Sequence, residues 1–105
     1  MRVRRPEDVR GEVRRWAAKI GVDPKGVQFQ RMTKKWASCS TSGRIYLSQD
    51  LLRESRAFRE IVIVHELLHL TVPNHGKLFK SLMNAYLPDW EARARGRLAR
   101  MCESE

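Results

Sequence analysis

Apolar residues in the first fifth of the chain recur at the spacing of a helix. They stand three or four positions apart on one face, with charged residues between them: Val9, Val13, Trp16, Ala17 and Ile20. Pro6 suits the first turn of such a helix, and Gly21 is placed to cap its end. The pattern predicts a helix over residues 6–20 that buries one stripe against a core.

The middle of the chain shows the alternation of strands instead. Residues 27–33 alternate imperfectly between apolar and polar positions, which predicts a half-buried strand. Residues 36–40 and 44–48 are two short runs joined by a turn that contains Gly43, and they predict a hairpin. Together the three segments predict a small antiparallel sheet.

Helical spacing returns in the second half of the chain. Residues 50–53 open a helical turn, and Ser55 is placed to cap a long helix. The inward positions of this helix are Phe58, Ile61, Val62, His65, Leu68 and His69. Its β-branched run at 61–64 leaves a strand as the alternative, although the two histidines would then lie about 13 Å apart. Two further helices are predicted over residues 76–87, up to Pro88, and over residues 90–101.

These elements predict an α+β fold in which a short antiparallel sheet packs on helices. The 105 residues fit a single small domain, 1–105, which can bury a core without disulfides. The two cysteines, Cys39 and Cys102, are too few for a disulfide scaffold. Cys39 is interpreted as a small buried residue and not as a metal ligand, because three histidines make a further ligand unnecessary.

All three histidines of the chain fall within residues 65–75. On a helix with 3.6 residues per turn, His65 and His69 stand one above the other and direct two imidazoles at one point. Glu66 lies about 100° round the helix from His65, where its carboxylate can reach a water on a bound metal without binding the metal itself. A catalytic zinc takes three protein ligands and keeps a fourth position open, so His75 is the candidate third ligand.

The chain must turn back after the helix for His75 to join the pair. Pro73 predicts the end of the helix, because it lacks an amide proton and restricts Val72 to an extended conformation. Asn74 tolerates the left-handed turn that would reverse the chain. The result, H-E-x-x-H-x-x-x-x-x-H, has the histidine spacing of metzincins, with Val72 in place of their glycine. The simpler interpretation, ordinary histidines on an amphipathic helix and a loop, accounts for fewer of these features.

Two blocks of the sequence resemble a known family. HELLHLTVPNHGKLF, over residues 65–79, is similar to the active-site segment of YgjP-like metallopeptidases, which are related to SprT-like and WLM proteases. KKWASCSTSGRIYL, over residues 34–47, resembles a second family stretch, with Lys35 in place of an arginine and Ala37 in place of a glycine. The resemblance implies a metallopeptidase. Family members usually carry an additional β-rich N-terminal region, so the chain is expected to be a bare catalytic core.

The charge of the chain favours anionic partners. Its 21 basic residues outweigh 12 acidic ones and give a formal net charge of +9, which suits nucleic acid, acidic peptides or a membrane surface and also keeps a small domain soluble. No base-reading motif accompanies the charge, so any contact with nucleic acid is expected to be non-specific. No secretory signal or membrane-spanning run is present, and the protein is expected to be cytoplasmic. The sequence does not indicate an oligomeric state.

The sequence therefore predicts a zinc-dependent metallopeptidase with Glu66 as general base and Zn²⁺ held by His65, His69 and His75. A peptide or protein substrate would pair with the sheet edge formed by Trp36, Ala37, Ser38 and Cys39. Lys35, Tyr86 or an arginine could stabilise the oxyanion. The alternative is a nucleic-acid-associated module in which the histidines hold a structural metal and no peptide is cut. Glu66 argues against it, because a structural site needs no carboxylate between its histidines.

Overall fold

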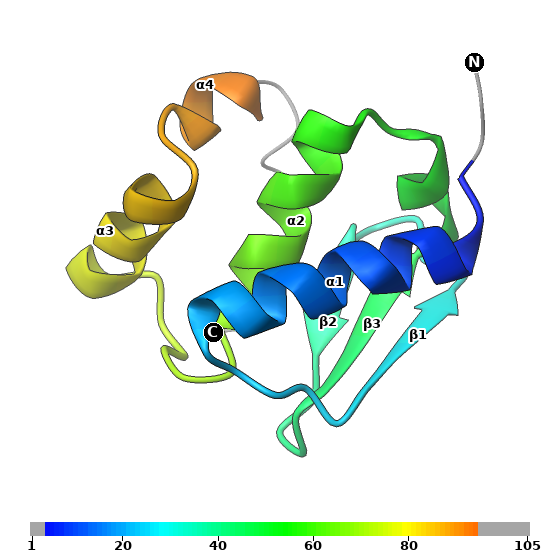
Figure 1. The fold of residues 1–105 in the computed structure, drawn as a ribbon, viewed down its shortest axis with the longest axis horizontal. Helices are drawn as coiled ribbons and strands as arrows, with labels where there is room; N and C mark the ends of the chain where they lie inside the picture. The colour runs from blue at the N-terminus through cyan, green and yellow to red at the C-terminus, as the bar shows by residue number, and fades with distance from the viewer. Residues whose placement is uncertain (1–3, 95–105) are drawn as a thin grey trace.

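A computed structural model describes residues 4–94 of the chain. Its helices are α1 (Pro6–Ile20), a 3₁₀ turn (Gln49–Arg53), α2 (Arg56–Leu68), α3 (Lys77–Tyr86) and α4 (Trp90–Arg93). Its strands are β1 (Gly26–Gln30), β2 (Ala37–Cys39) and β3 (Arg44–Ser48). Helix α2 runs through the middle, with the sheet on one side and with α3 and α4 on the other (Figure 1). The α+β class expected from the sequence is confirmed.

Helix α1 has the predicted bounds and the predicted end. Gly21 adopts a left-handed conformation with φ of 89°, and its amide donates to the carbonyl of Ala17 at 2.8 Å. Glycine takes this conformation without the steric penalty of a side chain, so the helix stops there. The apolar stripe of α1 then faces α2, with Val9, Val13 and Ala17 buried.

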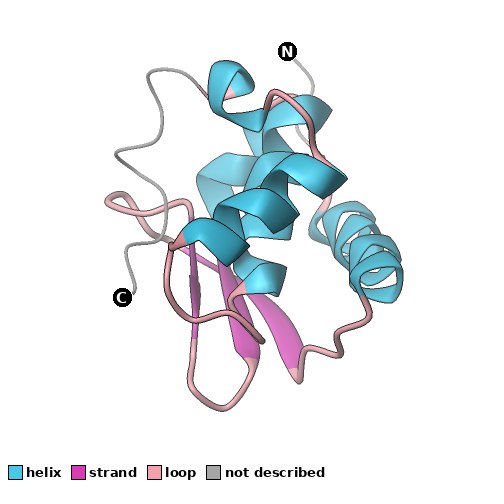
Figure 2. Cartoon of the chain, turned by 90° about the vertical axis from the view of Figure 1, so that its left-hand side faces the viewer, coloured by secondary structure: helices cyan, strands magenta, loops and turns pink. Residues whose placement is uncertain are grey.

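The sheet is mixed, and the prediction of an antiparallel sheet is wrong for one of its two strand pairs. Strands β2 and β3 form the expected antiparallel hairpin, whereas β1 pairs with β3 in parallel and ends at Gln30, short of the predicted 33. The strand order is β1-β3-β2. The central place of β3 has a physical reason, because its Ile45 and Leu47 are fully buried while β1 is only half-buried and suits an edge. The helices lie on one side of this sheet (Figure 2).

The β-branched run at 61–64 is helical, so the strand alternative is wrong. Ser55 caps α2 as predicted, because its hydroxyl accepts the Phe58 amide at 3.2 Å. The helix ends at Leu68, however, and not at Pro73. The next three amides donate to carbonyls three residues back, each at 3.1 Å, which tightens the final turn before the proline is reached.

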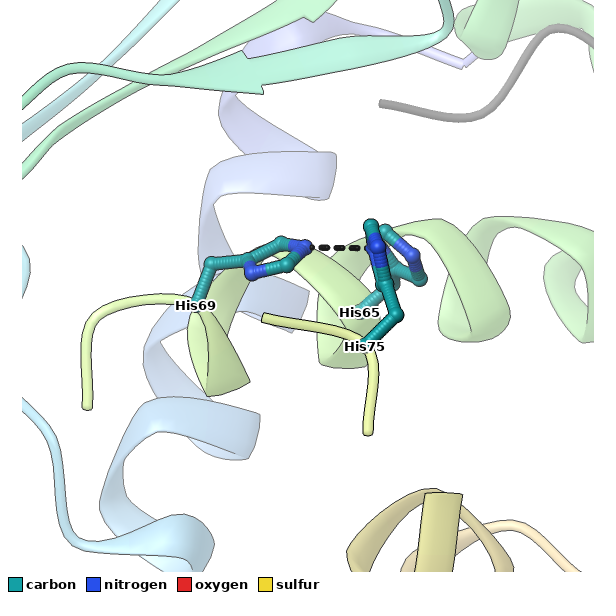
Figure 3. A group of neighbouring side chains, drawn as sticks. All are labelled: His65, His69 and His75. Carbon is teal, nitrogen blue, oxygen red and sulfur yellow. Dashed lines mark hydrogen bonds between the residues drawn. The ribbon is translucent and has the colours of Figure 1, made fainter. Parts of the chain in front are cut away.

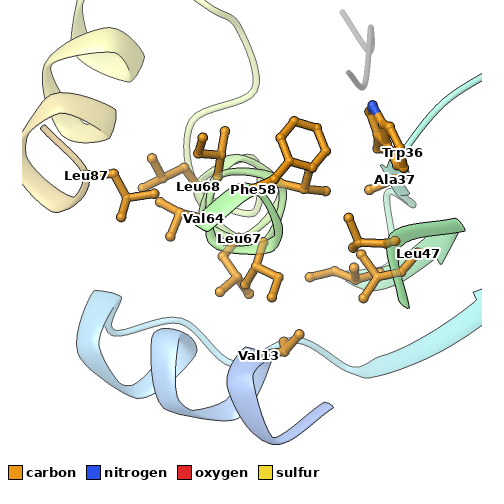
Figure 4. Close-up of a cluster of buried hydrophobic side chains, with 14 of the residues drawn as sticks. Val13, Trp36, Ala37, Leu47, Phe58, Val64, Leu67, Leu68 and Leu87 are labelled. Atoms are coloured by element: carbon orange, nitrogen blue, oxygen red, sulfur yellow. The ribbon is translucent and has the colours of Figure 1, made fainter. Parts of the chain in front are cut away.

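Helix α2 is buried on every side over residues 61–68. Such a helix can be apolar all round only if neighbours cover its whole circumference. Figure 4 shows that cover, with Leu47 and Ala37 of the sheet on one side, Val13 of α1 below and Leu87 on the other side. Burying each large apolar side chain contributes about 1.5–3 kcal/mol. Among the described elements, α2 supplies more buried apolar residues than any other.

A buried ion pair also joins α1 to α2. Arg59 donates to the two carboxylate oxygens of Glu12 at 2.9 and 2.7 Å, and to the carbonyl of Glu54 at 2.8 Å. Arg59 is 2% exposed and Glu12 is 8% exposed. The hydrogen bond with Glu12 raises the pKa of Arg59 above its usual value, against the opposing effect of burial. The guanidinium is therefore charged and paired with the Glu12 carboxylate.

Helix α3 lies where the sequence predicts it, and α4 begins at the predicted Trp90. Helix α4 ends at Arg93, short of the predicted 101, and residues 95–101 and Cys102 lie outside the described residues. Within residues 4–94, none of the helices has the length and hydropathy to cross a membrane.

Candidate metal centre

The end of α2 and the loop before α3 bring the histidines together. His65 is in the last turn of α2, His69 is the residue that caps this helix, and His75 lies in the loop just before α3. One nitrogen from each ring can be chosen so that all three lie within 4.8 Å of one another. Figure 3 shows the rings converging, with the Nε2 atoms of His69 and His75 separated by 3.0 Å. Such a group of imidazoles can hold one metal ion.

Neighbouring groups orient two of the three rings. Nδ1 of His69 lies 3.2 Å from the carbonyl oxygen of Val72, which leaves its Nε2 facing His75. Nδ1 of His65 lies 3.3 Å from the Glu66 carboxylate. A second ring nitrogen held by a carbonyl or a carboxylate is the usual way in which proteins fix the direction of a metal-binding histidine.

The loop before His75 reverses by a different route from the predicted one. Asn74 is not left-handed, since Asp89 is the only non-glycine residue with positive φ in the described part of the chain. Instead the Asn74 side-chain oxygen accepts the Gly76 amide at 3.1 Å. This side-chain turn brackets His75 and sets its direction without unusual backbone angles.

Phe79 of α3 completes the wall of the centre. Its ring centroid lies 5.0, 4.7 and 5.0 Å from those of His65, His69 and His75, and it is stacked on His69. Sequence reasoning identified Phe79 only as a core position of its helix. The sequence did contain one hint of its role. Phe79 stands four residues after His75, about one turn into a helix that is predicted to start beside that histidine.

Glu66 is the most constrained polar group of the centre. It is 1% exposed, and one carboxylate oxygen faces His65 while the other is buried without a hydrogen-bond partner among the described residues. An unsatisfied buried carboxylate oxygen is costly, so it marks a place where a further polar group fits. Three imidazoles with such a carboxylate next to one of them form a donor set that suits a divalent metal.

Electrostatics keep His69 in the form that binds metal. Burial, followed by the positive charge that His65 can carry, lowers the pKa of His69 below its usual value of 6.5, although Glu66 acts in the opposite direction. At neutral pH His69 therefore presents a neutral imidazole, as metal coordination requires.

A cavity of about 330 Å³ opens beside the centre. Its walls come from the end of β2, the β2–β3 turn and the segment at and after the end of α2. The lining residues are Cys39, Ser40, Thr41, Gly43, His69, Leu70 and Pro73. Of these, sequence reasoning named only Cys39 and His69 as candidate site residues. The small polar composition of the turn was a weak signal, because most tight turns share it.

The four residues predicted to bind substrate divide into two pairs. Trp36 and Ala37 are 4% and 0% exposed, and the Trp36 ring packs on Phe58 at 5.0 Å, so their side chains belong to the core. Ser38 and Cys39 are half-buried, and Cys39 faces the cavity beside His69.

The three candidates for the oxyanion are also placed by the structure. Lys35 is exposed two residues before the start of β2, whereas Tyr86 packs edge-on against Trp16 of α1 with ring centroids 6.4 Å apart. No arginine lines the cavity beside His69, judged from the residues that the structure describes. None of the three is therefore seen next to the histidines.

Comparisons with known proteins agree with this geometry. A search of the curated proteins finds no match. Among solved structures, the chain is similar to the crystal structure of the metallopeptidase zymogen of Pyrococcus abyssi abylysin, with a TM-score of 0.75 and 20% identity. The alignment covers 90% of this chain and 99% of that one, which establishes the fold. The model of the YgjP-like metallopeptidase domain matches residues 1–100, and the chain therefore belongs to this family of metallopeptidases.

Proposed function

We propose that the protein is a zinc-dependent peptidase and that residues 1–105 form one catalytic core domain. The observation that carries the proposal is the convergence of three imidazole nitrogens within 4.8 Å, beside a buried glutamate with one unpaired oxygen. His65, His69 and His75 would hold the ion and Glu66 would be the general base. Three nitrogen ligands and a neighbouring carboxylate suit catalytic zinc, which keeps a position open for substrate or water.

The chain supplies the proton transfers. When bound, zinc polarises the scissile carbonyl and makes water acidic enough to be deprotonated near neutral pH. Glu66 would take the proton of the attacking water on its unpaired oxygen and pass it to the leaving amine. Its other oxygen, 3.3 Å from Nδ1 of His65, keeps the carboxylate fixed during both steps.

The sheet offers one edge for an extended peptide. In the described part of the chain β1 and β2 are the two edge strands. The guanidinium of Arg10 donates to the Val27 carbonyl of β1 at 3.1 Å and so occupies part of that edge. Strand β2 leads directly to the cavity beside His69. We therefore place the substrate along β2, with backbone hydrogen bonds providing alignment and the cavity receiving a side chain.

Two substitutions test this assignment. Purified protein should contain about one zinc per chain, with nitrogen ligands at roughly 2.0–2.1 Å. Glu66→Gln should retain zinc and the fold while losing cleavage of an unstructured protein, and His69→Ala should lose the zinc itself. Metal analysis, circular dichroism and a gel-based cleavage assay measure the three properties. Equal loss of metal in both variants would make Glu66 a ligand or a structural residue and contradict the proposal.

A further inference from the structure

Two segments on either side of Glu66 in the sequence carry no carboxylate. Residues 24–49, which hold all three strands, and residues 67–88, which hold His75 and α3, contain no aspartate or glutamate. Their charged side chains are all basic and exposed: Lys25, Arg31, Lys34, Lys35, Arg44, Lys77 and Lys80. The acidic residues of the described chain lie instead on α1, α2 and α4 and in the connections outside these two segments. The positive charge of these two segments is therefore not offset by any acidic residue within them.

Two of these lysines share a hollow with the edge strand. A cavity of about 320 Å³ is lined by Met32, Thr33, Lys34, Lys35 and Ser38, and Ser38 is the middle residue of β2. Within residues 4–94, neither Lys34 nor Lys35 has a carboxylate in ion-pair distance, whereas Arg56 and Arg93 both pair with Glu60. The lysines are therefore available to an acidic group that approaches along β2.

The direction of β2 fixes where such a group would lie in a substrate. The lysines precede β2, and the strand then runs from Ala37 to Cys39, which shares the cavity of His69. Lys35 precedes Cys39 by four residues, a span of about 13 Å in an extended strand. A peptide paired antiparallel to β2, the slightly more stable arrangement, runs the opposite way, so the residues after the cut pass Lys34 and Lys35.

We infer that the peptidase selects substrates with an acidic side chain roughly three to five residues after the cut, bound by Lys34 and Lys35. The inference rests on the proposed peptidase function. Exposed charge pairs are individually weak, so the two lysines together should favour a glutamate over a glutamine at that position by roughly threefold to tenfold in kcat/KM. The preference should shrink as salt rises, because these lysines are open to solvent.

The test uses three peptides that are identical except for the third to fifth residues after the cut, which are all Glu, all Gln or all Lys. The native protein should cleave them in that order, and Lys34→Glu/Lys35→Glu should reverse the order. Arg14→Glu/Arg15→Glu is the matched control, because it changes two adjacent exposed arginines of α1 by the same total charge. This control should keep the native order. A binding measurement with the three peptides and the uncleaving Glu66→Gln protein gives the same comparison without catalysis.

The outcomes separate the inference from the function on which it rests. Equal cleavage and equal binding of the three peptides, with activity that depends on Glu66, would overturn the inference alone. Absence of Glu66-dependent cleavage with any peptide would overturn the proposed function and the inference with it. A single-stranded oligonucleotide provides the competing partner. Suppose that the native protein binds the oligonucleotide, that Lys34→Glu/Lys35→Glu does not, and that the peptides show no charge preference. This result would overturn the inference in favour of a nucleic-acid surface.

Discussion

At the scale of single residues, Phe79 determines how tightly the three imidazoles are held. Its ring touches all of them, and it is only 1% exposed. An aromatic ring packed against each imidazole restricts the rotamers that would otherwise scatter the nitrogens. Phe79 offers no metal ligand of its own. We expect its contribution to be that it keeps the three nitrogens converged.

Replacing Phe79 with leucine should weaken zinc binding. Leucine keeps the helix and much of the buried area but withdraws the ring from the imidazoles, and the loss of such a support typically costs about tenfold to a hundredfold in metal affinity. Competition with a chromogenic chelator measures the affinity. Met83→Leu is the control, because Met83 is also buried on α3 and is one turn further from the histidines. Equal affinity in the native and Phe79→Leu proteins would mean that the rings are held by their hydrogen bonds alone.

The sequence predicted the convergence of the histidines because the positions of two of them depend only on helix geometry. It could not predict the contact of Phe79 with their rings, since a phenylalanine at helical spacing looks like any core residue until the direction of α3 is known. The turn at Asn74 shows the same limit. Asparagine reverses a chain either by its backbone or by its side chain, and only the structure shows that the side chain is used here.

At the scale of elements, short-range pairing was predictable and long-range pairing was not. The β2–β3 hairpin follows from a tight turn between neighbouring strands. The parallel β1–β3 pair joins strands separated by β2, and no local pattern distinguishes it from an antiparallel neighbour. The buried pair of Glu12 and Arg59 is a similar case, because its members are 47 positions apart and each looks like a surface residue of its helix.

Glu12→Gln should destabilise the fold strongly. The substitution leaves the Arg59 charge buried without its counter-charge, and breaking a buried ion pair on one side typically costs about 3–5 kcal/mol. Urea unfolding followed by circular dichroism measures the loss. Glu7→Gln is the matched control, since Glu7 lies on the same helix and is exposed. The double variant Glu12→Leu/Arg59→Met should recover much of the stability, and a double variant as unstable as Glu12→Gln would contradict this account.

At the scale of the whole molecule, the metal centre joins two parts of the fold. His65 and His69 belong to the end of the central helix α2, while His75 and Phe79 belong to the loop and helix that follow. A metal held by all three histidines would cross-link α2 to the start of α3. Because the unfolded chain does not present the three imidazoles together, binding of the metal is also stabilisation of the fold.

Zinc should therefore raise the melting temperature, and more so at neutral than at acidic pH. At about 100 times its Kd a ligand raises the free energy of unfolding by about 2.7 kcal/mol, which corresponds to a rise in melting temperature of roughly 10–20 °C for a domain of this size.

The pH dependence follows from His69. Burial lowers the pKa of His69 below 6.5, so its imidazole is neutral at pH 7.5 and protons compete with zinc for it only as the pH falls below 6.5. Without metal, the stability of the fold also falls as the pH drops through 6.5. The unfolded chain takes up the His69 proton at a higher pH than the folded chain does, so protonation favours unfolding. Thermal melts with zinc or with a chelator at pH 7.5, 6.5 and 5.5 measure the difference, and His69→Ala should show none at any pH. A zinc-dependent difference in the native protein that does not change with pH would mean that His69 is not among the ligands.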